Sequence, residues 1–117
     1  MSKKIIIIED DADILDIMTY ILSEEGYDVL AAKDSEPLGD VHLHRPGLII
    51  LDNRLTDSFG RDFCRQFKND PETRHFPIVL VSASPHLDEM ALESKADGWL
   101  QKPFDIAELV ELVKKFA

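Results

Sequence analysis

Cysteine, long apolar runs and positive charge are all scarce in this sequence. The single cysteine, Cys64, cannot form an internal disulfide, which is typical of a reducing compartment. The main apolar runs, 5–8 and 48–51, fall far short of the roughly 20 residues that a membrane-spanning helix needs, and no signal-peptide h-region is found. We therefore expect a cytoplasmic protein that does not contact a membrane.

The shortage of positive charge bears on the binding partners. With 23 aspartates and glutamates against 13 lysines and arginines, the formal net charge is −10 at pH 7. Binding to nucleic acid and to anionic membranes depends largely on basic side chains. The balance therefore argues against direct nucleic-acid binding.

Size and composition indicate one domain. The 117 residues are 44% hydrophobic and 31% charged, which suits a single core. Prolines and glycines are scattered, and no repeat, low-complexity tract or linker-like stretch divides the chain. We expect residues 1–117 to form one domain without an output domain, whether as a whole product or as a piece of a longer protein.

Hydrophobic spacing predicts five strands, each followed by a helix. The strands lie at 5–8, 27–32, 48–51, 78–81 and around 99–100, and their buried-type runs are typical of a parallel sheet. The first helix ends at Gly26, and weaker helices open at Ser35 and Ser84. A third helix carries phenylalanines at 59, 63 and 67, which we expect to pack on the sheet. The last helix begins with the capping-box pair Asp105 and Glu108.

These five units predict the fold class and the place of any ligand. Parallel strands need right-handed crossovers, which place helices on both faces of the sheet. We therefore expect an α/β protein, doubly wound and flavodoxin-like, a (βα)5 fold with a five-stranded parallel sheet of order 2-1-3-4-5. In that order, ligands bind at the carboxyl ends of strands 1 and 3, which directs attention to the residues after Ile8 and Leu51.

Carboxylates gather at these two strand ends. Glu9 and Asp10 follow the first strand, and Asp52 follows the third. Like charges so close together cannot all stay ionised without compensation. A hard cation such as Mg²⁺ (or Mn²⁺) supplies it, because such ions prefer oxygen ligands. Lys102, after the last strand, can reach the same end as a second source of positive charge.

Other residues that could carry chemistry receive structural interpretations. Asp11 and Asp13 lie in the first turn of the first helix, where carboxylates favour the helix dipole and free N–H groups. Cys64 is expected to be a small buried hydrophobe rather than a reactive thiol. The histidines lack the spacing of a metal or phosphohistidine site, and we expect them on the surface or in loops: His42, His44, His75 and His86.

Over essentially its whole length, the sequence resembles the response-regulator receiver family of two-component signal transduction. Each motif alone is weak, but together and in order they are specific. The motifs are Glu9-Asp10-Asp11 after the first strand, Leu51-Asp52, Gly60 eight residues beyond, Val81-Ser82-Ala83, and the run from Ala96 to Phe104 that contains Trp99 and Lys102-Pro103.

The resemblance implies a metal-dependent phosphoacceptor site. Asp52 would accept a phosphoryl group from a phosphohistidine donor. Asp10, Asp52 and the backbone carbonyl of Arg54 would ligate Mg²⁺, with Glu9 acting through water. Lys102 would pair with a phosphoryl oxygen, and its peptide bond to the following proline resembles the cis bond of the family.

The resemblance also implies a switch and its partners. Ser82 would donate its hydroxyl to a phosphoryl oxygen, and Trp99 would report the change at the outer face. The surface made by the fourth helix, fifth strand and fifth helix would then bind a downstream protein or a second copy of the chain. The implied donor is a sensor histidine kinase or a histidine phosphotransfer protein. The implied role is not that of an enzyme, since the chain would promote its own phosphorylation and dephosphorylation without turning over an external substrate.

Departures from the family pattern and rival functions are few. Thr56 stands where proline is frequent, Ser82 replaces threonine, and Arg54 and Ser84 occupy positions that influence the phosphoryl lifetime. A flavin protein of the same fold would need hydroxyls and glycines after the first strand, where this chain has acids. A receiver-like protein that only docks to partners is the stronger rival, although every required side chain is present. A phosphatase acting on external substrates would need a general acid or a water-positioning group near Asp52, and none is identifiable.

Overall fold

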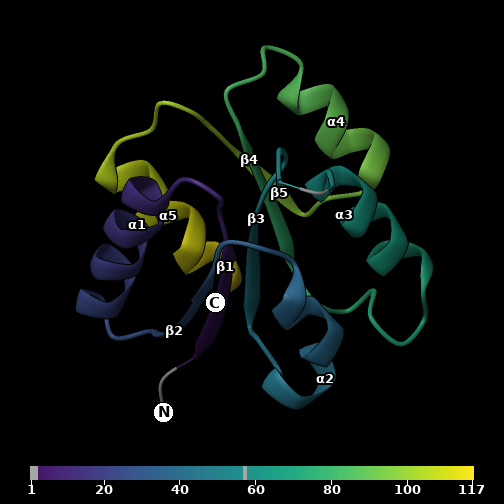
Figure 1. Cartoon of the computed structure of the whole chain (residues 1–117), viewed down its shortest axis with the longest axis horizontal. Coiled ribbons are helices and arrows are strands. Elements are labelled where there is room, and N and C mark those ends of the chain that lie inside the picture. The colour runs from purple at the N-terminus through teal and green to yellow at the C-terminus, as the bar shows by residue number, and fades with distance from the viewer. Residues whose placement is uncertain (1–2, 57) are drawn as a thin grey trace.

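A parallel sheet runs through the centre of the protein, with strand order β2-β1-β3-β4-β5 (Figure 1). The computed structural model describes residues 3–56 and 58–117. The predicted doubly wound α/β fold and its strand order are thereby confirmed. The elements are β1 Lys4–Ile8, α1 Ala12–Glu24, β2 Asp28–Ala32, the 3-10 helix η1 Glu36–Asp40, α2 Val41–His44, β3 Leu48–Asp52, α3 Gly60–Asn69, β4 Ile78–Ser82, α4 Leu87–Ser94, β5 Gly98–Gln101 and α5 Ile106–Phe116.

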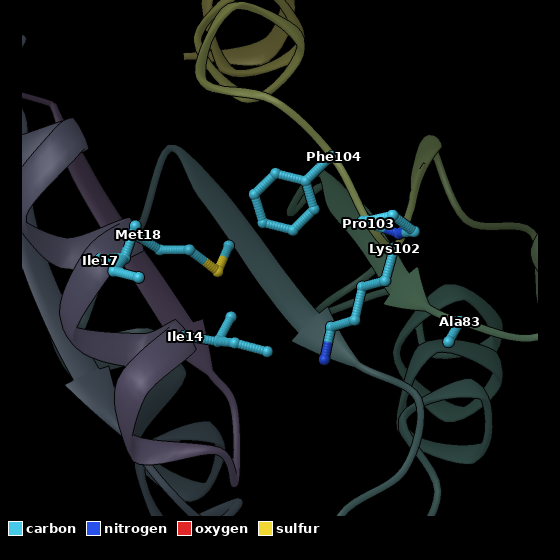
Figure 2. A pocket seen from close by; sticks show the side chains of 7 residues that line it. All are labelled: Ile14, Ile17, Met18, Ala83, Lys102, Pro103 and Phe104. Carbon is cyan, nitrogen blue, oxygen red and sulfur yellow. The ribbon is translucent and has the colours of Figure 1, made fainter.

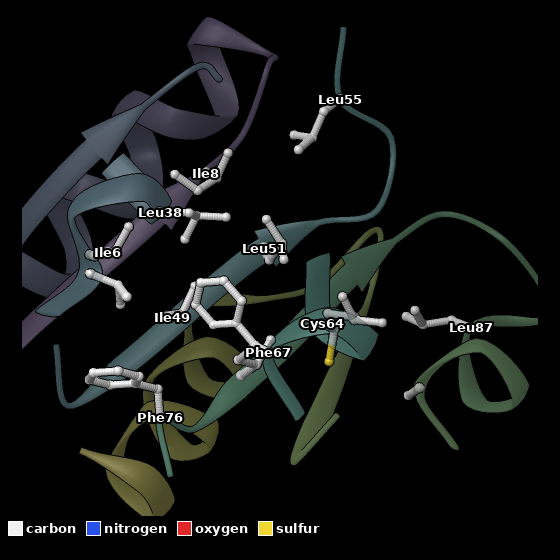
Figure 3. Close-up of a cluster of buried hydrophobic side chains, with 14 residues drawn as sticks. Ile6, Ile8, Leu38, Ile49, Leu51, Leu55, Cys64, Phe67, Phe76 and Leu87 are labelled. Atoms are coloured by element: carbon white, nitrogen blue, oxygen red, sulfur yellow. The ribbon is translucent and has the colours of Figure 1, made fainter. Parts of the chain in front are cut away.

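Two apolar layers, one on each face of the sheet, form the core. Successive side chains of a strand point to opposite faces. Ile6 and Ile8 of β1 therefore pack toward α2, α3 and α4, in the layer drawn in Figure 3. Ile5 and Ile7 pack toward α1 and α5. All four isoleucines are fully buried, which explains why β1 lacks polar alternation.

Two helix starts differ from the sequence predictions, and another helical segment opens at Ser35 as predicted but differs in type. The second helical segment consists of the short 3-10 helix η1 followed by four residues of α2. Helix α4 begins at Leu87 rather than at Ser84, because the Ser84 hydroxyl accepts the N–H of His86 (3.1 Å) and holds a turn before the helix. Helix α3 begins at Gly60, so the prediction that Phe59 lies on this helix and packs on the sheet is wrong. Its side chain is 43% exposed, whereas Phe67 is buried.

Caps and buried polar groups follow the predictions more closely. Asp11 is the N-cap of α1, accepting the N–H groups of Asp13 and Ile14 at 3.0 and 3.2 Å. The predicted capping box at the start of α5 is present. Cys64 is fully buried with its Sγ 3.4 Å from the Ser94 carbonyl, and burial raises the pKa of its thiol. Three of the four histidines are exposed, and the half-buried one is His44. No helix in the described ranges is long and apolar enough to cross a bilayer.

Candidate functional site

The strand register brings the predicted acids together. Ile8 of β1 pairs with Leu51 of β3, so the residues that follow them meet at one edge of the sheet. Carboxylate oxygens of Glu9, Asp10 and Asp52 lie within 4.8 Å of one another. Glu9 and Asp52 are buried, with exposed fractions of 1% and 5%, whereas Asp10 faces solvent.

Lys102 reaches the same acids from the end of β5. Its backbone N–H donates to the Ser82 carbonyl (2.8 Å), which fixes the start of the loop beyond the strand, and its peptide bond to Pro103 is cis. The Nζ atom lies 2.6 Å from Glu9 Oε1 and 3.6 Å from Asp52 Oδ2. The Lys102 ammonium thus lies at the acidic strand ends, where the sequence analysis expects a second source of positive charge.

Charge within this cluster is incompletely balanced. Burial, followed by the neighbouring Glu9 carboxylate, raises the pKa of Asp52 to about 8. Burial also acts to raise the pKa of Glu9, but its interactions with Asp52 and Lys102 outweigh that effect and lower it. Burial opposes the charge of Lys102, yet the two acids hold the pKa of its ammonium above the ordinary value. The buried pair Glu9 and Asp52 therefore retains a proton that a cation can displace.

The residues present fit a divalent metal ion. Once the proton shared by Glu9 and Asp52 has left, three carboxylates and one ammonium leave two negative charges uncompensated, and the donor set is oxygen only, which suits Mg²⁺. Despite the short contact with Lys102, the buried Oε1 of Glu9 accepts no hydrogen bond of good geometry from the described residues. Asp10 and Asp52 would hold the ion directly.

A cavity of about 510 Å³ opens above these acids. It gathers Asp10, Asp52, Arg54, Ser82 and Lys102, all of which the sequence predicts for the site. Buried Glu9 lies beneath it rather than in its wall. The Arg54 N–H donates to Asp52 Oδ1 at 3.4 Å, which places that residue directly over the carboxylate.

Ser82 and Trp99 occupy different surroundings. The Ser82 hydroxyl accepts the Ser84 N–H (3.0 Å) at the end of β4, so its own proton remains available toward the cavity. Trp99, on β5, is 50% exposed and lies outside the acidic cavity. It borders a separate depression of about 260 Å³ with Glu108 and Lys115 of α5.

Gly60 has a steric role that its sequence position alone does not reveal. A Cβ built there would overlap the carbonyl oxygen of Asp52. The Gly60 N–H donates to the Asn53 carbonyl at 2.7 Å. Glycine therefore lets the first turn of α3 press directly against the backbone that carries the acid.

Three further residues at the rim were missed by the sequence analysis. Arg61 and the side-chain amide of Asn53 both point N–H groups at the sulfur of Met90, at 3.6 and 3.4 Å. The guanidinium of Arg61 also lies 5.0 Å from the ring centroid of Phe59. No spacing rule joins these positions, because α3 and α4 meet only in the folded chain.

An apolar cavity of about 400 Å³ lies beside the acidic one (Figure 2). Ile14 and Met18 of α1 point across it toward Lys102 and Phe104. Ile17, on the same helix, borders it and is 57% exposed. The lysine thus forms part of both walls, with its ammonium at the acids and its stem against apolar side chains.

The fold and the site define an α/β protein with an acidic metal-type pocket at its topological switch point. Residues 5–114 match the response regulator receiver domain, so the chain belongs to the response regulator receiver family. A putative response regulator from Chloroflexus aurantiacus is 27% identical, with a TM-score of 0.90 over 99% of this chain and 98% of that one.

Receiver domains of histidine kinases are similar as well. The signal receiver domain of a signal transduction histidine kinase from Syntrophus aciditrophicus is 29% identical, with a TM-score of 0.88 over 98% of this chain and 89% of that one. The receiver domain of a Pseudomonas aeruginosa sensor histidine kinase, which has a magnesium ion coordinated in its active-site cleft, is 24% identical, with a TM-score of 0.87 over 99% and 98%. The chain is thus a signalling domain of the two-component type.

Proposed function

We propose that this chain is a phosphoacceptor that takes a phosphoryl group on Asp52 in a Mg²⁺-dependent reaction. The observation that carries the proposal is the buried Asp52 carboxylate at the end of β3, beside Glu9 and Asp10 and 3.6 Å from the Lys102 ammonium. A phosphoryl acceptor needs one reactive oxygen beside concentrated positive charge, of which Lys102 supplies a part and a Mg²⁺ ion held by the acids would supply the rest. The magnesium site reported for the Pseudomonas aeruginosa receiver domain supports the choice of ion.

The chain's own residues would perform the transfer by position and charge. A carboxylate oxygen of Asp52 forms a bond to phosphorus while the bond from phosphorus to the imidazole of a phosphohistidine breaks, and the imidazole leaves with the electron pair. The Lys102 ammonium moves from Glu9 to pair with one phosphoryl oxygen. The Ser82 hydroxyl donates a hydrogen bond to another phosphoryl oxygen. Asp10, Asp52 and the Arg54 carbonyl would hold Mg²⁺, which would neutralise oxygen charge and lower the pKa of the Asp52 carboxyl, so that its proton leaves to solvent.

Partners follow from this chemistry. The donor is a sensor histidine kinase or a histidine phosphotransfer protein. A phosphoryl group that draws Ser82 inward would alter the surface of α4, β5 and α5, where a downstream protein or a second copy binds. The chain catalyses its own phosphorylation and dephosphorylation and does not turn over an external substrate.

Intact-mass spectrometry after incubation with acetyl phosphate and Mg²⁺ tests the proposal. Wild type should gain one phosphoryl group that hydroxylamine removes, and Asp52→Asn should gain none. Asp13→Asn is the matched control, because Asp13 is an exposed acid in the first turn of α1 outside the metal-type cluster. If wild type gained no phosphoryl group, the chain would be a protein that only docks to partners. If Asp52→Asn gained one, Asp52 would not be the acceptor.

A further inference from the structure

The first turn of α3 places an additional cation at the rim of the acidic cavity. The half-buried side chain of Arg61 lines the same cavity as Asp52 and Lys102. Among the residues that the structure describes, no carboxylate forms an ion pair with its guanidinium. A charged group with neither full solvation nor an anionic partner is available to an anion that enters the cavity.

The side chain of Arg61 is oriented by weak interactions with its neighbours. Its Nη1 donates to the Met90 sulfur at 3.6 Å, and a thioether is a poor acceptor. The face of its guanidinium lies 5.0 Å from the ring centroid of Phe59. Its backbone N–H donates to Asn53 Oδ1 at 3.1 Å, which anchors the main chain. The side chain is thus held in place without using up its capacity for two parallel hydrogen bonds to oxygen.

The main chain brings Arg61 within reach of the acceptor. A Cβ at Gly60 would overlap the Asp52 carbonyl oxygen, so the two backbones are in contact. The Cα of Arg61 follows that of Gly60 by about 3.8 Å. Arg61 and Asp52 also line the same cavity, so the long arginine side chain can turn within it toward a group attached to the Asp52 carboxylate.

We propose that Arg61 is a phosphoryl-binding residue of this chain, which exchanges the sulfur of Met90 for a phosphoryl oxygen once Asp52 is modified. The proposal rests on the proposed phosphoacceptor function. A charge-assisted bond from guanidinium to phosphoryl oxygen is much stronger than one to a thioether. The exchange removes one of the two N–H donors from the Met90 sulfur, and among the described residues the donor that remains is the Asn53 amide.

Beryllofluoride, a non-covalent mimic of a phosphoryl group on a carboxylate, tests this proposal by calorimetric titration in saturating Mg²⁺. Arg61→Gln should bind the probe about tenfold more weakly, since a charge-assisted bond is lost. Arg61→Lys should recover part of the affinity. Arg65→Gln, an exposed residue on the same helix whose partner is Asp62, should match wild type. Affinity for Mg²⁺ alone should be the same in all four proteins.

Met90→Leu separates binding from packing. It removes the sulfur acceptor and keeps an apolar side chain on α4, so beryllofluoride affinity should stay equal to that of wild type or rise. Equal affinity of Arg61→Gln and wild type would overturn the proposal. A loss of beryllofluoride affinity in Met90→Leu as large as the loss in Arg61→Gln would also overturn it, because Arg61 would then act through α3–α4 packing. Failure of wild type to bind the probe would overturn the phosphoacceptor function itself.

Discussion

The protonated state of Asp52 links metal binding to pH. Burial and the Glu9 carboxylate raise its pKa to about 8, far above the ordinary 3.8 of an aspartate. A metal ligand must be deprotonated, so cation binding near neutral pH has to release that proton. The apparent affinity for Mg²⁺ should therefore rise with pH and level off above about 8.

Calorimetry in buffers of different ionisation enthalpy measures this proton release directly. At pH 6.5 we expect close to one proton per Mg²⁺ bound by wild type, and markedly less at pH 9. Asp52→Asn, which has no proton to lose at this position, is the control and should bind weakly without the pH dependence. Constant affinity of wild type across this range would contradict the assignment of the titrating group.

Most site residues could be predicted from the sequence, because parallel strand ends are geometrically related. Glu9 and Lys102 each follow a strand directly and Asp52 is the last residue of β3, so the strand order alone brings them to one edge. Arg61 and Met90 could not be predicted in this way. Their contact joins α3 to α4 across 29 residues and depends on how the two helices pack.

At the scale of elements, the approach of α3 to β3 depends on Gly60. Gly60→Ala should destabilise the protein by about 1–3 kcal/mol, as expected when a methyl group is forced into a packed contact. The displaced backbone belongs to Asp52. The same variant should therefore also lose Mg²⁺ affinity.

Urea unfolding of the metal-free protein checks the stability change. Gly39→Ala is the matched control, because nothing lies within 4 Å of a Cβ at that position. It should be neutral or slightly stabilising, since alanine restricts the unfolded chain. If both variants unfolded at the same urea concentration as wild type, the close contact of α3 with Asp52 would have no energetic consequence.

Strands were easier to predict than helix starts for a physical reason. A buried strand such as β3 needs only a run of apolar residues, and all five of its residues are buried. A helix start depends on which of several competing local hydrogen bonds is the most stable. Ser84 was expected to open α4, but its hydroxyl closes a turn instead, and the helix begins at Leu87.

At the scale of the whole molecule, the proposed switch links the acidic cavity to Trp99, which lies outside that cavity. β4 and β5 are paired from Val79 and Gly98 to Ser82 and Gln101, which connects the cavity to Trp99 through the sheet. Phosphorylation of Asp52 should change the fluorescence of Trp99, the single tryptophan in the chain. Ser82→Ala should still accept the phosphoryl group but lose most of that change, because we propose the Ser82 hydroxyl as the coupling group.

Stopped-flow fluorescence with acetyl phosphate and Mg²⁺, calibrated by intact mass, measures this coupling. Ser23→Ala is the control, since it removes an exposed hydroxyl on α1 that does not line the acidic cavity. A full fluorescence response of Ser82→Ala at matched phosphorylation would exclude Ser82 from the switch.

The strand order also sets the sequence in which the protein can complete its core during synthesis. β1 is made first, yet it lies between β2 and β3 and cannot be enclosed until β3 has emerged. The layer toward α1 stays open longer still, because Leu109 and Val113 of α5 are buried within it. A nascent chain that has formed every strand therefore still lacks part of the apolar cover over this layer until α5 has left the ribosome.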